Sequence, residues 1–123
     1  MSQQQQEKKI IGKIPNSIIN KYSMHDCENK NIVVYADRYI HFEGHKHEYI
    51  NESSYNKSIN SLGVIITSPD FVYENVANNS YEFYKKLDEN VCLAVRISKG
   101  KDLKIRTLFP ITEAKLNKRK NNS

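Results

Sequence analysis

The sequence predicts a single α+β domain, in which helical segments come first and a run of antiparallel strands follows. With 123 residues the chain has room for one modest hydrophobic core. The apolar residues Tyr55, Ile59, Leu62 and Ile66 recur at spacings of four, three and four, which is the period of a helix. After Pro69 apolar and polar residues alternate, and short turns separate the alternating runs, so we expect an antiparallel meander.

The elements are expected in the following order. A short helix begins near residues 15–17, with Asn16 or Ser17 as its cap, and reaches about Tyr22. A β-branched run at 32–36 predicts a strand, a second helix is expected in the stretch that follows Asp37, and a third is expected over about 54–69. Four strands are then expected at 71–76, 80–87, 91–98 and 103–109, and Thr112 would cap a short basic helix.

Composition sets the expected domain limits and compartment. Residues 1–9, with four consecutive glutamines, predict a disordered tail, residues 10–115 a single domain, and residues 116–123 a basic tail. No apolar run is long enough for a membrane span or a signal peptide, so we expect a cytoplasmic protein without membrane contact. Cys27 and Cys92 form no CxxC pair and are expected to be reduced structural thiols, although a disulfide is the alternative.

The net charge of +5 permits an anionic partner without requiring one. Much of it comes from the last nine residues, which carry Lys115, Lys118, Arg119 and Lys120. A basic tail of this kind would attract nucleic acid in a salt-dependent manner without regard to sequence.

The segment 37–49, DRYIHFEGHKHEY, contains three of the four histidines. Asp37 stands where a helix cap belongs, Ile40 is the expected inward anchor, and Gly44 would weaken a helix interior by roughly 1 kcal/mol. A helix here would place His41 and His45 on one face, because they are four residues apart. Imidazoles exchange protons near neutral pH, so one hypothesis is acid–base chemistry on a phosphodiester, and the other is a solvated, His-rich helix end.

The last two predicted strands suggest a surface for an anionic ligand. Alternation places Arg96, Lys104 and Arg106 on the face opposite the core, with Tyr84 nearby, where they could hold phosphates and stacked bases. The alternative is a sheet that simply shows its polar side to water. Thr107 falls by alternation on the core face, where its hydroxyl could bond a phosphate oxygen or a backbone group.

A metal site is a competing hypothesis. The candidate ligands are His25, Cys27, His41, His45 and His47, which include His-x3-His and His-x-Cys spacings. Zinc accepts such ligands, but the spacing matches no strong zinc pattern, so a zinc-stabilised adaptor is the weaker alternative.

Several short motifs resemble a known family when they are taken in order. They are IGKIP at 11–15, IVVY followed by YIHFEGHKH, SPDFV at 68–72, FYKKL at 83–87, VCLAVRI at 91–97 and KIRTLFPITEAK at 104–115. Together they resemble the phage-borne branch of the barnase–EndoU–colicin–RelE-like nuclease superfamily.

This resemblance implies a fold in which N-terminal helices pack on a four-stranded antiparallel sheet. It also implies metal-independent RNA cleavage without a cofactor. In that chemistry a base takes the ribose 2′-hydroxyl proton, the 2′-oxygen attacks phosphorus, and an acid protonates the leaving 5′-oxygen. The product is a 2′,3′-cyclic phosphate.

The resemblance also implies roles for individual residues. His41 is similar to the family's helix histidine, His45 or His47 to the second histidine, Lys85 or Lys86 to a strand cation, and Thr107 to the final-strand hydroxyl. We expect His47, Tyr84, Arg96 and Arg106 to bind substrate. The implied protein is an RNase, with tRNA among its candidate targets, acting as a toxin or effector of a phage or mobile element with an antidote or immunity protein. The alternative is an inactive RNA- or protein-binding module of the same fold.

Overall fold

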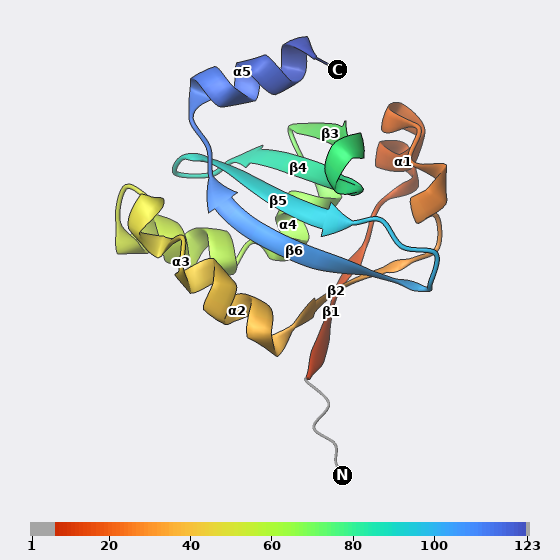
Figure 1. Ribbon diagram of the computed structural model, residues 1–123, viewed down its shortest axis with the longest axis horizontal. Helices are drawn as coiled ribbons and strands as arrows, with labels where there is room; N and C mark the ends of the chain where they lie inside the picture. The colour runs from red at the N-terminus through yellow and green to blue at the C-terminus, as the bar shows by residue number, and fades with distance from the viewer. Residues whose placement is uncertain (1–6, 123) are drawn as a thin grey trace.

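The computed structural model describes residues 7–122, whose strands form one six-stranded sheet in the order β1-β2-β6-β5-β4-β3 (Figure 1). The strands are β1 (Lys8–Lys13), β2 (Asn31–Tyr35), β3 (Phe71–Asn75), β4 (Ser80–Lys86), β5 (Asn90–Arg96) and β6 (Asp102–Pro110). The α-helices of these residues are α1 (Asn16–Tyr22), α2 (Ala36–Glu43), α3 (Glu52–Ile59), α4 (Leu62–Thr67) and α5 (Glu113–Asn121). Short 3-10 turns lie at η1 (His25–Cys27), η2 (Lys46–Glu48) and η3 (Val76–Asn78).

The expected α+β class is correct, but the predicted four-stranded antiparallel sheet is wrong. Strands β3 to β6 do form the antiparallel meander, and β2 then joins the sheet by pairing with β6 in parallel. Strand β2 is buried along Ile32, Val33 and Val34, and its backbone is paired with β1 on one edge and with β6 on the other. Parallel strands are not joined by a tight turn, so the sequence contains no turn signal for this pair. The spacing of apolar residues therefore did not reveal the pairing.

Regular structure begins earlier and ends later, within residues 7–122, than composition predicts. Residues 1–6 lie outside the described part, but Lys8 and Lys9 belong to β1, which pairs antiparallel with β2. The first element is therefore a strand, whereas the sequence analysis expected a helix. At the other end, the expected tail from residue 116 is helical through Asn121, and Leu116 is buried. Thr112 caps this helix by accepting a hydrogen bond from the Lys115 backbone, as predicted.

The predicted helix over 54–69 is two helices. Asn60 and Ser61 separate α3 from α4, and Ser61 lies at the N-cap position of the second. Both residues are weak helix formers, since their side chains compete for backbone hydrogen bonds. The break still leaves Leu62 and Ile66 buried, so the apolar spacing predicted the inward face correctly even where the helix is interrupted.

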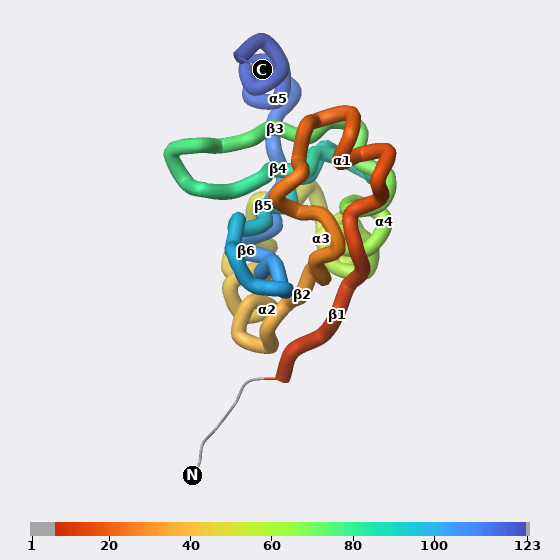
Figure 2. The backbone as a smooth tube through the Cα atoms, turned by 90° about the vertical axis from the view of Figure 1, so that its right-hand side faces the viewer, coloured from red at the N-terminus to blue at the C-terminus, as the bar shows by residue number. Residues whose placement is uncertain are grey.

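The two faces of the sheet are covered unequally. The main core lies on one face, where Phe83, Leu93 and Ile105 meet side chains from α1, α2, α3 and α4. On the opposite face, Leu116 of α5 packs against Tyr84 and Cys92 in a smaller cluster. Figure 2 shows α1 and α4 on one side of the sheet and the β3–β4 hairpin projecting to the other.

Candidate active site

Helix α2 leaves the end of β2 directly and lies beside β6 (Figure 1). The helix begins at Ala36, so Asp37 lies in its first turn. The prediction that Asp37 caps the helix is wrong. The inward anchor is Phe42, which is 0% exposed, whereas the predicted anchor Ile40 is 75% exposed. Because Phe42 points into the core, its neighbour His41 points along the sheet toward β6.

His41 and Thr107 form the centre of the site. His41 lies in the last turn of α2, and its Nε2 is 3.0 Å from the Thr107 Oγ1 on β6, a hydrogen-bonding distance. These two residues are 66 positions apart in the chain. The contact therefore depends on the packing of α2 against β6.

A β-bulge in β6 determines where Thr107 points. Ala94 is paired with Thr107 and Val95 with Ile105, so Arg106 is an extra residue in the ladder. Simple alternation predicted that Thr107 would share the core face with Ile105. The bulge instead places Thr107 beside Ala94 on the face opposite the core, and the next residue, Leu108, is fully buried.

His45 lies beside His41, in the turn that follows the end of α2. Gly44 ends α2, and the backbone N–H of His45 donates to the Phe42 carbonyl in one more, tighter turn. The rings of His41 and His45 are 5.3 Å apart between centroids, edge to face. The His45 ring also lies 5.8 Å from the Phe109 ring, and its Nδ1 donates to a Glu48 carboxylate oxygen at 2.7 Å. These contacts hold the ring in place, and the bond to Glu48 uses Nδ1 rather than Nε2.

Two arginines border the His41–Thr107 pair. Arg38 lies one turn before His41, and its Nη1 donates to the Arg106 carbonyl at 3.1 Å. Arg106 in turn donates from Nη1 to the Ser80 Oγ at 3.0 Å. The bulge thus presents a guanidinium and a hydroxyl from adjacent residues, Arg106 and Thr107, on the same face as His41.

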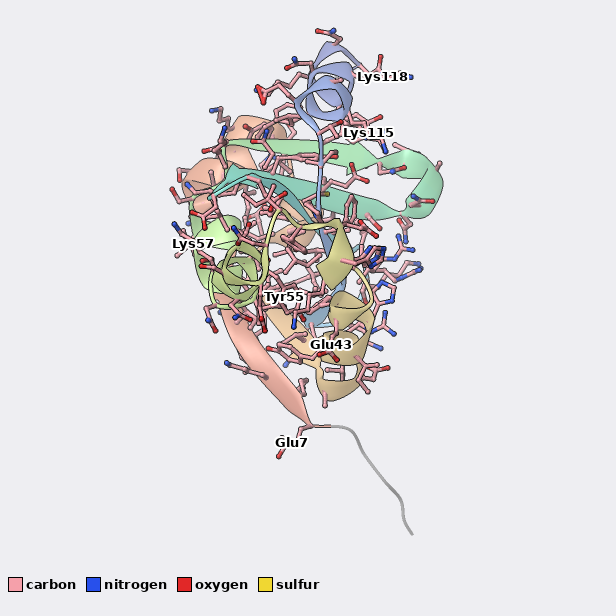
Figure 3. All side chains as sticks on the ribbon, turned by 90° about the vertical axis from the view of Figure 1, so that its left-hand side faces the viewer. Glu7, Glu43, Tyr55, Lys57, Lys115 and Lys118 are labelled. Carbon is pink, nitrogen blue, oxygen red and sulfur yellow. The ribbon has the colours of Figure 1, made fainter. Side chains whose placement is uncertain are left out.

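A groove of about 800 Å³ lies against this part of α2 and β6. It is lined by Lys8, Tyr35, Asp37, Arg38, Arg96, Lys104, Ile105 and Arg106. Figure 3 shows side-chain nitrogens gathered on this side of the molecule, between the β3–β4 hairpin and α2. The site is therefore strongly cationic.

The surroundings of His41 favour its neutral form. Partial burial, and after it the positive charges of Arg38, His45 and Arg106, lower the pKa of His41 below the usual value of 6.5. Asp37 acts in the opposite direction and only weakens the effect. A neutral imidazole near pH 7 is the form that can accept a proton.

A family model described as phage-Barnase-EndoU-ColicinE5/D-RelE like nuclease3 matches residues 8–118. The chain belongs to this nuclease family. The resemblance inferred from the ordered motifs is thereby confirmed. No curated protein and no solved structure gave a match.

Two residues expected in the nuclease site lie elsewhere. Lys85 pairs with the buried Val91 in the ladder, so its side chain lies on the core face of the sheet, opposite to Thr107. There its Nζ donates to the Ser68 carbonyl at 2.6 Å and lies 3.7 Å from Asp70. Lys86 follows it at the exposed end of β4. The structure does not bring this pair of lysines to the histidines, because β5 separates β4 from β6.

Tyr84 and His47 also differ from the expectation. Tyr84 is 1% exposed beneath α5, and its hydroxyl donates to Glu82 at 2.5 Å, so its ring offers no surface to a base. His47 is exposed in η2, and no ring contact or hydrogen bond ties it to His41 within residues 7–122. Of the two candidates for the second histidine, His45 is the one whose ring contacts His41 within the described residues.

Arg38 is the main residue that sequence analysis missed. Its spacing of three from His41 on a helix was a usable signal, since such residues share a face. The bulge also left a trace in the sequence, because Ile105 and Leu108 break the alternation of apolar residues by one position.

The candidate metal ligands lie in two regions, η1 and the segment from α2 to η2. Within residues 7–122 no group of three or more His, Cys, Asp or Glu side chains is placed to hold a metal ion. His25 pairs with Glu28 in the η1 region, and Cys27 and Cys92 are buried and free.

No helix of residues 7–122 is both long and apolar enough to cross a membrane.

Proposed function

We propose that this nuclease is a metal-independent endoribonuclease whose reacting groups are His41, His45 and Thr107. The observation that supports the proposal most strongly is the hydroxyl–imidazole contact of 3.0 Å with a second imidazole 5.3 Å away, beside two guanidinium groups. Two imidazoles can act as base and acid, and cations with a hydroxyl can hold a phosphorane.

In the proposed reaction, neutral His41 takes the proton of a ribose 2′-hydroxyl. The 2′-oxygen then forms a bond to phosphorus, and the bond from phosphorus to the 5′-oxygen breaks. His45 acts as the acid: Glu48 orients its ring, and the imidazolium gives its proton to the leaving 5′-oxygen. The products are a 2′,3′-cyclic phosphate and a free 5′-hydroxyl.

The remaining groups bind the phosphate. Arg38 and Arg106 lie close enough to His41 to affect its pKa, so they are placed to neutralise charge on the phosphoryl oxygens. The Thr107 hydroxyl, which faces His41 in the free protein, can donate to a phosphoryl oxygen when substrate is bound. These groups replace Lys85, the cation suggested by the resemblance.

The first experiment incubates purified protein with a labelled RNA and with the same RNA methylated at every 2′-oxygen, each with and without EDTA. We expect cleavage of the unmodified RNA alone, unaffected by EDTA, with cyclic phosphate ends identified by mass spectrometry. Substituting His41→Ala or His45→Ala should lower the rate about 10²- to 10⁴-fold.

His47→Ala is the matched control, because it removes a nearby exposed imidazole and should keep the rate within about twofold. Cleavage of the methylated RNA, or full activity of both His41→Ala and His45→Ala, would contradict the mechanism. Binding of RNA without turnover would instead favour an inactive module of this fold. A toxin role, with an antidote protein, requires that the wild-type chain but not His41→Ala arrests growth of cells that express it.

A further inference from the structure

The groove extends away from the catalytic pair toward the first turn of α2. Along β6, Arg106 adjoins Thr107, and Lys104 lies two residues further from it. Along α2, Arg38 lies one turn from His41, and Tyr35 precedes the helix. Arg96, at the end of β5, completes the wall. The basic side chains of the groove thus extend from the reacting groups in one direction, toward the first turn of α2.

The charge of this groove is poorly compensated by the protein itself. Its lining contains five basic side chains and one carboxylate. Lys8 is paired with Asp102 at 2.8 Å, and Arg38 lies 3.5 Å from Asp37. Arg96 and Lys104 make no ion pair or side-chain hydrogen bond within residues 7–122, although Lys104 lies over the Tyr35 ring at 5.2 Å. Like charges brought together in a concavity repel one another, and a bound anion relieves that repulsion.

The spacing of the cations suits more than one phosphate. Residues two apart on a strand are separated by about 6.6 Å, so Lys104 and Arg106 lie roughly as far apart as neighbouring phosphates on a nucleic-acid strand. Arg106 and Arg38 border the Thr107 hydroxyl, where the scissile phosphate is proposed to bind. Lys104 and Arg96 are then left for the next phosphate. The volume of about 800 Å³ is near the upper end of the range for small-ligand pockets, more than one phosphate needs.

We infer that the groove is a second phosphate subsite, which binds the backbone phosphate adjacent to the scissile one through Lys104 and Arg96. The preferred substrate is accordingly an RNA chain of at least three nucleotides. The contact with Tyr35 holds Lys104 in position for this role. The inference rests on the proposed ribonuclease function and adds the substrate length that the site selects.

The test compares kcat/KM for a dinucleotide, which contains only the scissile phosphate, with two trinucleotides that add one nucleotide on the 5′ or the 3′ side. We expect one trinucleotide to be cleaved at least tenfold more efficiently than the dinucleotide. In the double variant Arg96→Gln/Lys104→Gln the ratio of trinucleotide to dinucleotide kcat/KM should fall toward one. The double variant Lys115→Gln/Lys118→Gln, which loses the same charge from α5 outside the groove, should keep the ratio of the wild-type protein.

Equal kcat/KM values for all three substrates would overturn the inference while leaving the ribonuclease function intact. A ratio that survives Arg96→Gln/Lys104→Gln would do the same. Failure of the wild-type protein to cleave any substrate would reject the proposed function. The groove is then tested by equilibrium binding of 2′-O-methyl di- and trinucleotides, where the trinucleotide should bind more tightly and with a steeper dependence on salt. Equal affinities in the wild-type protein would overturn the subsite.

Discussion

His41 is partly buried and lies beside two arginines and a second histidine, and these surroundings determine the protonation state that it prefers. Burial and the charges of Arg38, His45 and Arg106 all disfavour the imidazolium, so the pKa of His41 lies below its usual value. The same arginines that are proposed to hold phosphate therefore also lower the pKa of His41. When the phosphate binds, its negative charge offsets theirs, and the proton from the 2′-hydroxyl becomes easier for His41 to accept.

This coupling predicts a pH effect. Activity should rise with pH as free His41 loses its proton, with a midpoint below the ordinary histidine value. Arg38→Gln removes one of the neighbouring charges, so the pKa of His41 should rise and the acidic limb of kcat/KM should move to higher pH. Titration of the His41 ring protons by NMR measures the same shift directly. An unchanged or lower midpoint in Arg38→Gln would show that Arg38 does not act on His41 electrostatically.

At the scale of elements, the bulge in β6 distinguishes this strand from a regular one. The extra residue places two consecutive side chains, Arg106 and Thr107, on the face opposite the core. Bulges bend a strand and re-aim side chains, and they are frequent beside active sites. Leu103, Ile105 and Leu108 remain buried on the other face, so the core is maintained through the irregularity.

Deletion of Arg106 tests the bulge. Without the extra residue, Thr107 would follow Ile105 directly and still face away from the core, with Leu108 still buried. We therefore expect a folded protein whose melting temperature changes by only a few degrees, but with cleavage reduced further than in Arg106→Ala, which keeps the bulge. Equal activity of the deletion and Arg106→Ala would mean that only the guanidinium matters. Thermal unfolding and RNA cleavage assays distinguish these outcomes.

At the scale of the whole molecule, one sheet supports different structures on its two faces. One face carries the main core, and the other carries α5 and the candidate catalytic groups. Helix α5 is held to that second face by Leu116 and by a buried carboxylate. Glu82 accepts hydrogen bonds from Tyr84 at 2.5 Å and Asn75 at 3.0 Å, and pairs with Arg119 at 3.3 Å. Its position in register with Ala94 and Thr107 places this network in the same cross-strand row as the site.

Loss of the Glu82 carboxylate should weaken the whole fold. Glu82→Ala leaves the buried Tyr84 hydroxyl and the Asn75 amide without their acceptor, and we expect a loss of about 3 kcal/mol in the free energy of unfolding. Urea denaturation measures it. Glu74→Ala, which removes an exposed carboxylate from the neighbouring strand β3, should cost less than about 0.5 kcal/mol. Similar small losses for both variants would show that the network does not hold α5.

The sequence by itself determined the elements with strong local patterns. The alternation of the last four strands, the Thr112 cap and the apolar face that runs through α3 and α4 were each predicted from neighbouring residues, because their period follows from local backbone geometry. The order of the short motifs resembles the nuclease family, and the family model confirms that resemblance. The strand β1 was missed because its charged, largely exposed residues depend on β2 for their hydrogen bonds.

Only the tertiary structure decided which of these residues meet. The parallel pairing of β2 with β6 brings α2 beside the bulge, and this places His41 against Thr107 across 66 positions of sequence. The same packing excluded Lys85 and Tyr84 from the site and added Arg38. A local pattern fixes which way a side chain points from its own element, whereas contacts between elements depend on register and long-range pairing, which no local period encodes.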